Sequence, residues 1–334
     1  MQSANGKRVY IQEVSARDGF QMEPTFVPTA RKIDFIDRLS GTGLAKIEVT
    51  SFTSPKAIPA LADAETVLSG IRRVPGVEYA ALVPNLRGCE RALSSGVDEI
   101  NLVMSVSESH NFANLRMHCE QSLAQFEGIV RRARDDVHIN ASLSTAFGCP
   151  FEGHIEPSRV LEFTDRLVRL GIGRVSLCDT TGVANPSQVQ HLFAQIKSRW
   201  PDIEFTAHFH NTRGMGLANA LAALEAGIDR FDASLGGLGG CPFAPGATGN
   251  VCTEDLVHML DGMGYETGVD LDALLLIAAE LPGLVGHEVP GQVLKAGRST
   301  RRYPVPIEPE RVSRQARLAG ISGPCSAGDI TWAD

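Results

Sequence analysis

The sequence predicts a (β/α)8 barrel, or TIM barrel, followed by extra C-terminal helices and an extended tail. Short runs of strand-like composition alternate with longer amphipathic segments eight times, which is typical of a parallel sheet covered by helices. Hydrophobic residues make up 43 % of the 334 residues and aromatic residues only 6 %, so Ala, Val, Leu and Ile must fill the core. No strand–GxGxxG–helix opening is present, which disfavours the alternative of a doubly wound open sheet.

Eight strands and the helical segments between them can be placed on the sequence in order. Two amphipathic segments, TARKIDFIDRLSGTG (29–43) and PSRVLEFTDRLVRLGIG (157–173), each end in glycine, as helices often do. The predicted strands span residues 9–16, 46–52, 78–84, 99–107, 138–147, 174–180, 204–210 and 230–237.

A different pattern follows the eighth strand. The stretch GLGGCPFAPGATGN (237–250) predicts a loop, and two helical stretches follow at about 253–264 and 270–286. The segment RSTRRYPVPIEPE (298–310) is rich in Arg and Pro and poorly periodic. We therefore expect a catalytic barrel domain with C-terminal helices over residues 1–297. Residues 298–334 are expected to form a tail that packs on the barrel or on a second subunit.

Composition and charge exclude several classes of protein. The net charge is −8 and no basic run is present, which makes nucleic acid and anionic membranes poor partners. The start, MQSANGKRVY, lacks the apolar segment of a secretory signal. No apolar run approaches the roughly 20 residues of a membrane helix. Seven scattered cysteines without CxxC pairs indicate a reducing compartment, so we expect a cytoplasmic protein without disulfides.

Polar residues gather at the ends of the predicted strands. Catalytic groups of (β/α)8 barrels lie at the carboxyl ends of strands. Charged side chains seldom lie on buried parallel strands unless they are paired or bind an ion. The candidate site residues at these ends are Arg17, Asp18, Glu48, Asp179, His208, His210 and Asn250.

The pair His208 and His210 predicts a metal site. Their i, i+2 spacing places both imidazoles on one face of a strand. Two imidazoles and the carboxylate of Asp18 suit a divalent cation, to which Asn250 could add a carbonyl oxygen. Two core histidines bonded to their neighbours are the alternative. A mixed nitrogen and oxygen set without thiolate favours Mg²⁺ or Mn²⁺, although the histidine pair alone would also suit zinc.

The remaining charged residues indicate the type of chemistry. Arg17 stays cationic and can stabilise an oxygen that gains negative charge, although a salt-bridge role is the alternative. Glu48 and Asp179 either take part in catalysis directly or orient a histidine or Arg17. A Schiff-base aldolase needs a desolvated lysine, and Lys56 is a weak candidate because it lies in the loop after the second strand. Carbon–carbon chemistry of the metal-dependent kind is therefore favoured.

At these residues the chain resembles the 3-hydroxy-3-methylglutaryl-CoA lyase family, within the superfamily of metal-dependent lyases and Claisen-condensing barrels. The resemblance covers about residues 8–288. The matching stretches are EVSARDGFQ (13–21), KIEVTSFTSPK (46–56), VPNLRG (83–88), GCPFEG (148–153), SLCDTTG (176–182), HFHNTRGMGLAN (208–219) and GLGGCPFAPGATGNVCTEDLV (237–257).

The resemblance implies a reaction and a role for each matching residue. The family reaction is a retro-Claisen cleavage of a tertiary 3-hydroxyacyl-CoA to acetyl-CoA and a keto acid. Arg17 would stabilise the thioester enolate and Cys241 would transfer a proton. The implied ligands of an activating Mg²⁺ or Mn²⁺ are Asp18, His208, His210 and Asn250. Supporting or substrate-contacting roles fall on Gln21, Glu48, Ser142, Asp179, Arg213 and Glu254.

Departures from the family pattern concern the acyl pocket. The usual H-x-H-D-T-Y-G reads HFHNTRG here, and Ser142 stands where a tyrosine is usual. Arg213 either adds a cation for a carboxylate or lies at the surface. 3-Hydroxy-3-methylglutaryl-CoA is the first substrate expected, with citramalyl-CoA or another branched 3-hydroxyacyl-CoA as the close alternative.

Two other classes of protein remain as alternatives. A Claisen-condensing synthase of the isopropylmalate or homocitrate type would carry more chain after the barrel and lack the GLGGCPFA loop. A degenerate barrel that serves as a scaffold would not need the metal ligands. As partners we expect an acyl-CoA thioester and a second copy of the chain, a dimer first.

Overall fold

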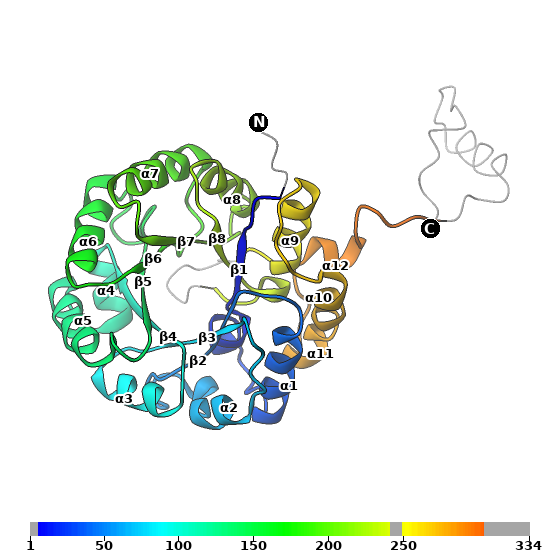
Figure 1. Cartoon of the computed structure of the whole chain (residues 1–334), viewed down its shortest axis with the longest axis horizontal. Helices are drawn as coiled ribbons and strands as arrows, with labels where there is room; N and C mark the ends of the chain where they lie inside the picture. Colours follow the sequence, from blue (N-terminus) through cyan, green and yellow to red (C-terminus); the bar gives the residue numbers. More distant parts are fainter. Residues whose placement is uncertain (1–5, 241–248, 304–334) are drawn as a thin grey trace. The chain divides into compact units, whose positions relative to one another are not determined.

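Eight parallel strands close into a barrel in the order β1 to β8, with β8 pairing back to β1. The structure is a computed structural model, which describes residues 6–240 and 249–303. The helices form a ring around the strands (Figure 1). The predicted (β/α)8 barrel is therefore confirmed. The strands are β1 (Tyr10–Glu13), β2 (Lys46–Ser51), β3 (Glu78–Leu82), β4 (Glu99–Ser105), β5 (His138–Ser144), β6 (Arg174–Asp179), β7 (Glu204–Phe209) and β8 (Arg230–Ala233).

The outer layer consists of helices whose apolar faces pack on the sheet. α5 is the longest of the described helices and buries Leu123, Phe126, Ile129 and Val130 on one side. The α-helices are α1 (Thr29–Ser40), α2 (Ala64–Gly70), α3 (Leu86–Ser94), α4 (Glu108–Leu115), α5 (Cys119–Ala133), α6 (Pro157–Arg169), α7 (Pro186–Arg199), α8 (Gly216–Glu225), α9 (Thr253–Gly262), α10 (Leu271–Ala278), α11 (Leu281–Val285) and α12 (Gln292–Ala296).

The structure shortens several predicted strands at their carboxyl ends: β4 ends at Ser105 rather than at residue 107 and β5 at Ser144 rather than at residue 147. The differences at β1 and β8 have a clear physical reason. β1 ends at Glu13 rather than at residue 16, and a short π-helix (Ser15–Gly19) follows it. β8 ends at Ala233 rather than at residue 237, because a 3-10 turn follows with Gly236 and Gly237 at φ of +65° and +71°. Only glycine adopts such φ values at little cost, and they cannot continue a strand.

The C-terminal helices also differ from the prediction. The second predicted stretch, 270–286, is two helices, α10 and α11, and α12 was not predicted. Pro282 lies in the first turn of α11. Proline suits the start of a helix but not its interior, because it lacks a backbone N–H, which accounts for the break.

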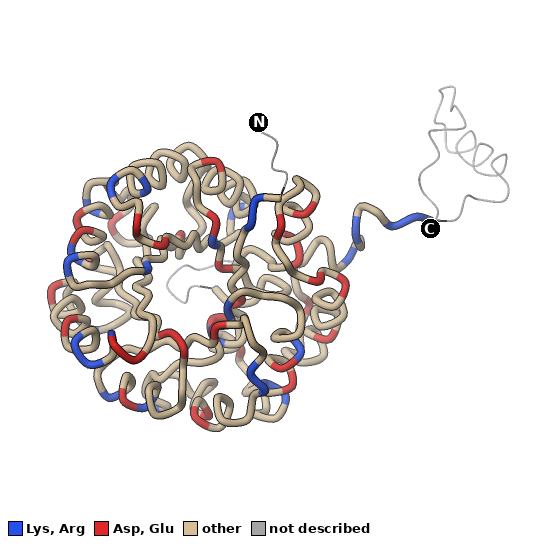
Figure 2. Tube along the Cα trace, viewed as in Figure 1, with Lys and Arg blue, Asp and Glu red and all other residues tan. Residues whose placement is uncertain are grey.

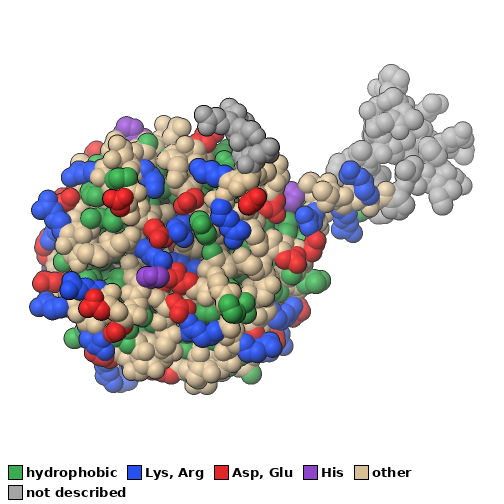
Figure 3. Space-filling view, viewed as in Figure 1, with side chains coloured by type: hydrophobic (Ala, Val, Ile, Leu, Met, Phe, Trp, Pro, Cys, Tyr) green, Lys and Arg blue, Asp and Glu red, His purple; other side chains and the backbone are tan. Residues whose placement is uncertain are grey.

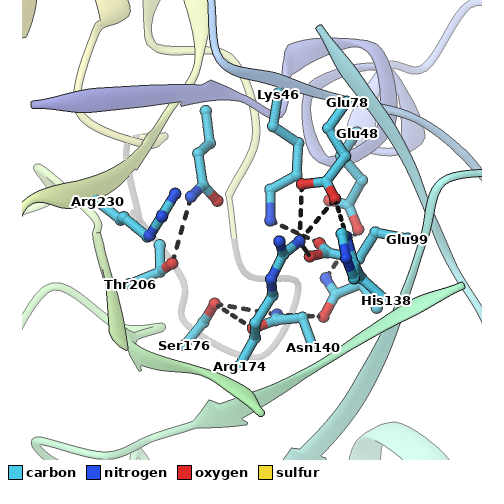
Figure 4. Close-up of polar contacts among 12 residues, drawn as sticks. Lys46, Glu48, Glu78, Glu99, His138, Asn140, Arg174, Ser176, Thr206 and Arg230 are labelled. Carbon is cyan, nitrogen blue, oxygen red and sulfur yellow. Dashed lines mark hydrogen bonds and ion pairs between the residues drawn. The ribbon is translucent and has the colours of Figure 1, made fainter. Parts of the chain in front are cut away.

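Ion pairs fill the amino ends of the strands inside the barrel. Lys46 Nζ lies 2.5 Å from Glu99, and Arg174 donates to both Glu99 and Glu78 (Figure 4). These charges come from β2, β3, β4 and β6, so the network ties strands far apart in sequence. It leaves the opposite, carboxyl end of the barrel for the site.

The surface carries both signs of charge. Acidic and basic residues are interspersed around the helix ring and on the face shown in the space-filling view (Figures 2 and 3). None of the helices in the described ranges is long and apolar enough to cross a membrane. The chain divides into two units, residues 1–296 and 297–334. Most of the predicted tail, from residue 304 onward, lies outside the described residues.

Candidate active site

Three predicted ligands meet at the carboxyl end of the barrel. Asp18 comes from the π-helix after β1, His208 from β7 and His210 from the residue after β7. One ligand atom of each lies within 4.8 Å of those of the other two, and all three residues are buried. The two imidazole centroids are 5.3 Å apart. The i, i+2 spacing thus brings both rings to one side of the strand, as expected.

The π-helix fixes Arg17 and Asp18. The backbone N–H groups of Arg17, Asp18 and Gly19 all donate to the carbonyl oxygen of Val14, which turns the chain sharply at the strand end. Arg17 donates through Nε to Glu48 Oε2 and through Nη1 to Asp18 Oδ1, each at 2.6 Å. Its Nη2 donates to none of the residues that the structure describes. The buried guanidinium is therefore held between two carboxylates with one nitrogen left for the cavity.

Asn250 reaches the site because the chain returns between the ends of β7 and β8. Asn250 pairs with His210 in an isolated bridge, and the N–H of Val251 donates to the carbonyl oxygen of Phe209. The Asn250 amide nitrogen donates to Asp18 Oδ2 at 2.7 Å. Gly239 passes close by: a Cβ there would lie 2.7 Å from this amide nitrogen. Only glycine fits at position 239, next to the Asp18–Asn250 pair.

The three-residue cluster fits a divalent cation. Nδ1 of His210 is buried and hydrogen-bonds none of the described residues. Burial lowers the pKa of His210 to about 4, so its ring is neutral and able to bind a metal. Burial opposes ionisation of Asp18, but the charge of Arg17, with that of His208 and the hydrogen bond from Asn250, outweighs it and lowers the pKa of the carboxyl group. One carboxylate and two imidazoles form an oxygen and nitrogen donor set.

Asp232, on β8, is a site residue that the sequence analysis missed. Its Oδ2 lies 3.1 Å from His208 Nδ1, which leaves Nε2 as the nitrogen for a metal. Burial lowers the pKa of His208, but the hydrogen bond and charge of Asp232 outweigh it and raise the pKa. A carboxylate on the far nitrogen fixes the tautomer of a metal-binding histidine. An acidic residue in the strand RFDA was the available signal.

Two other predicted residues lie apart from the cluster's hydrogen bonds. The sequence predicts that Asp179 takes part in catalysis or orients a histidine or Arg17. Its carboxylate instead accepts the backbone N–H groups of Val183 and Ala184, which shapes the loop after β6. Burial raises the pKa of Asp179 to about 6. Arg213 donates to the carbonyl oxygens of Thr181 and Gly182 in the same loop.

Glu254 and Glu13 hold the start of the glycine-rich loop. Glu254 Oε2 accepts the N–H of Gly236, and Glu13 accepts the N–H of Leu235 and the hydroxyl of Thr253. Both carboxyl groups are fully buried. They satisfy the backbone of the 3-10 turn that follows β8 and so fix where the loop leaves the barrel.

The buried carboxyl group of Glu254 makes stability depend on pH. Burial raises its pKa from 4.5 to about 7, so above pH 4.5 the unfolded state releases this proton more readily than the folded state. The resulting loss of folded-state stability is absent below pH 4.5, grows as the pH rises and is complete above pH 7. It reaches about 3 kcal/mol of unfolding free energy. Relative to the native protein, Glu254→Gln should therefore gain stability between pH 5 and pH 8, measured by urea unfolding.

The matched control is Glu225→Gln, which changes an exposed glutamate. Its stability difference from the native protein should be the same at both pH values. A Glu254→Gln difference that is also independent of pH would contradict the raised pKa.

The cluster opens into a cavity of about 790 Å³. Asn101, Ser142 and Cys178 line it from β4, β5 and β6, and Gln21 lines it beside Asp18, to which it donates at 3.1 Å. Cys241 lies outside the described residues, and the neighbouring Gly240 lines the cavity.

These features define a class of protein: a (β/α)8 barrel with a buried aspartate–histidine cluster that could hold a metal ion, and a fixed arginine, at the carboxyl ends of its strands. The chain belongs to the HMGL-like family, whose model matches residues 8–280. The family resemblance seen in the sequence and the enzyme class that it implied, a carbon–carbon lyase, are thereby confirmed.

Three relatives show how similar the chain is to characterised proteins. It is 45 % identical to hydroxymethylglutaryl-CoA lyase YngG of Bacillus subtilis, over 88 % of this chain and 99 % of that one. It is 39 % identical to (R)-citramalyl-CoA lyase of Chloroflexus aurantiacus, over 93 % and 99 %. A solved HMG-CoA lyase of Acinetobacter baumannii, in complex with coenzyme A and 3-methylmalate, is 51 % identical. It superposes with a TM-score of 0.86 over 90 % of this chain and 98 % of that one.

Proposed function

We propose that the protein cleaves 3-hydroxy-3-methylglutaryl-CoA to acetyl-CoA and acetoacetate, with Mg²⁺ or Mn²⁺ as its cation. The observation that carries this proposal is the juxtaposition of Asp18, His208 and His210 with the fixed guanidinium of Arg17 at one end of a large cavity. The relatives named hydroxymethylglutaryl-CoA lyase support the same substrate. A cytoplasmic location and a dimer stay predictions.

The reaction breaks the bond between C2 and C3 of the acyl group. The 3-hydroxyl loses its proton to water in the cavity, and its oxygen forms the carbonyl group of the keto acid. The electron pair of the broken bond remains on C2 as the enolate of acetyl-CoA. A proton from a donor group then completes acetyl-CoA at C2, and the proton that the 3-hydroxyl group lost returns to that donor through water.

The cation would be held by Asp18, His208 and His210, with Asn250 beside Asp18. When bound, it supplies positive charge that lowers the pKa of the substrate hydroxyl group.

Arg17 stabilises the negative charge that develops on the thioester oxygen. Two of its nitrogens are already fixed by Glu48 and Asp18, so no reorientation is needed as the charge forms. Burial opposes its charge, but the neighbouring carboxylates outweigh it and raise the pKa of the guanidinium. The side chain is therefore cationic throughout the reaction.

Cys241 is the proposed donor of the proton to C2. A thiol has an ordinary pKa of about 8.5, so it is protonated at neutral pH and still acidic enough to donate. Its place in the GLGGCPFA stretch, after Gly239 and Gly240, supports this role because Gly239 packs against Asp18 and Asn250.

A second candidate substrate is citramalyl-CoA, which has one methylene fewer between C3 and the carboxylate. Ser142 and Ser144 give the cavity a small, polar wall on β5. The 39 % identity to (R)-citramalyl-CoA lyase supports this candidate.

A direct assay distinguishes the candidates. Purified protein is loaded with Mg²⁺ or Mn²⁺ and given each thioester in turn, and release of acetyl-CoA and keto acid is followed. Faster cleavage of 3-hydroxy-3-methylglutaryl-CoA supports the proposal, and faster cleavage of citramalyl-CoA replaces it with the second candidate. Cleavage of neither would overturn both.

Cys241→Ser should bind the cation with native affinity but lose kcat by about 100-fold, because a hydroxyl group is a far weaker acid than a thiol. Steady-state kinetics and Mn²⁺ binding measure the two effects. The control is Cys89→Ala, which removes a buried thiol that belongs to α3 and does not line the cavity. Native turnover in Cys241→Ser would remove this thiol from the mechanism.

A further inference from the structure

Asn101, on β4, joins the wall of the cavity to the arginine. Its amide nitrogen donates to Glu48 Oε1 at 2.8 Å. Its amide oxygen accepts from Asn140 Nδ2 and from the hydroxyl of Ser142, each at 2.9 Å. Glu48 in turn accepts from Arg17. A continuous chain of hydrogen bonds thus runs from β5 through β4 and β2 to the π-helix.

The amide of Asn101 has one possible orientation. Glu48 is ionised in its 2.6 Å ion pair with Arg17 and can then only accept hydrogen bonds, so the amide nitrogen of Asn101 must face it. The oxygen must then face Asn140 and Ser142, whose donors both reach it. Asn140 in turn donates to the hydroxyl oxygen of Ser176, on β6. Figure 4 shows this contact, with Glu48 also inside the barrel.

Each member of this chain is buried, with at most 8 % of its surface exposed. A buried carboxylate that loses one of its donors is costly and moves or takes up a proton instead. Glu48 has two donors on separate oxygens, Arg17 on Oε2 and Asn101 on Oε1. Without Asn101, only Arg17 would hold the Glu48 carboxylate among the described residues. Asp18 would then be the one partner of Arg17 whose own position does not depend on that pair.

We propose that Asn101 is a positioning residue, which fixes Glu48 and through it the direction of the Arg17 guanidinium. This inference rests on the proposed function only where it refers to catalysis. Asn101 also lines the cavity, and Ser142, which donates to it, stands in the same wall. The acyl-facing wall and the cationic group are therefore parts of one hydrogen-bonded unit.

Asn101→Leu tests the inference, because leucine has a similar size and no hydrogen-bonding group. A misplaced guanidinium should lower kcat between about 10- and 100-fold. KM for the thioester and the affinity for Mn²⁺ should stay within about twofold of native values, since the cation ligands keep their own contacts. An unchanged kcat, or a loss confined to KM, would overturn the positioning role.

A double-mutant cycle shows whether Asn101 acts through Glu48. In a Glu48→Gln background the anchor is already disturbed, so Asn101→Leu should lower kcat less than about threefold further. Full additivity of the two losses would contradict the proposed route.

Asn219→Leu is the matched control for a structural effect. Asn219 is a fully buried asparagine on α8 whose amide donates to the carbonyl oxygen of Ala184. Its melting temperature should fall by about as much as that of Asn101→Leu, but its kcat should stay within about threefold of the native value. A kcat loss equal to that of Asn101→Leu would show that the effect is one of stability alone.

An activity-independent measurement separates this inference from the proposed function. The Nε proton of Arg17, bonded to Glu48 at 2.6 Å, should exchange slowly with water in the native protein, followed by NMR with ¹⁵N-labelled arginine. In Asn101→Leu its exchange should be at least about tenfold faster, which corresponds to about 1.4 kcal/mol of lost protection. Unchanged exchange would refute the inference even in a protein that cleaves the thioester. Faster exchange would support it even if neither thioester is cleaved.

Discussion

Replacement of Arg17 by glutamine should lower kcat by about 1000-fold, the upper range for losing one fixed donor to a developing oxyanion. The reason is the geometry of the guanidinium: Nε and Nη1 are held by Glu48 and Asp18, Nη2 bonds to none of the described residues, and Arg17 lines the cavity. Glutamine keeps a polar amide but lacks the charge. Lysine should restore part of the rate, because it carries a charge without the planar fork.

The measurement is steady-state kinetics with the preferred thioester, alongside Mn²⁺ binding by calorimetry. Affinity for Mn²⁺ should change much less than kcat, because Arg17 is not a ligand. Arg174→Gln is the matched control: it removes a partly buried arginine from the opposite end of the barrel, where Arg174 pairs with Glu99 and Glu78. It should lower stability rather than kcat. A native rate in Arg17→Gln would exclude the arginine from the chemistry.

His208→Ala should weaken binding of Mn²⁺ by more than about 100-fold, since loss of a mere hydrogen-bond partner of a ligand already costs 10- to 100-fold. The ring belongs to the buried cluster with Asp18 and His210 and is oriented by Asp232. Alanine removes the ligand and leaves the Asp232 carboxylate without its partner. Titration of metal-free protein with Mn²⁺, followed by electron paramagnetic resonance, measures this directly and does not depend on turnover.

His138→Ala serves as the control, because His138 begins β5 and bonds to Glu78 at the amino ends of the strands. Its Mn²⁺ affinity should equal that of the native protein. Equal affinities in His208→Ala and His138→Ala would refute the ligand assignment. Asp232→Asn should lower the affinity for Mn²⁺ by an amount between the effects of the two histidine variants.

The order and number of the strands could be predicted because their pattern is local. Each run of strand-like residues lies between amphipathic segments, and the eight repeats indicate a closed parallel sheet. The ends were less predictable. The residues after Glu13 have the composition of a continuing strand. In the structure, however, the carbonyl oxygen of Val14 accepts three backbone N–H groups, and the chain forms a π-helix instead.

Several site residues could be recognised from their type and position at strand ends. The pair His208 and His210 and the neighbours Arg17 and Asp18 carry local signals of this kind. Asp232 and Asn101 carry weaker signals, because each is one polar residue on a strand whose partner is remote: His208 is 24 residues away and Glu48 is 53 residues away. Asp179 is, like Glu48, an acidic residue on a predicted strand, yet its carboxylate bonds to the backbone of the loop after β6.

The sequence by itself determined the barrel, the family and the set of donors that a metal and an enolate would need, because those depend on residue type and on periodicity along the chain. Only the tertiary structure decided which polar residues share hydrogen bonds. Those contacts depend on the closure of the sheet, which brings β1 beside β8 and carries Asn250 back to Asp18. The same closure places Glu48 between Arg17 and Asn101, a juxtaposition that no spacing in the sequence encodes.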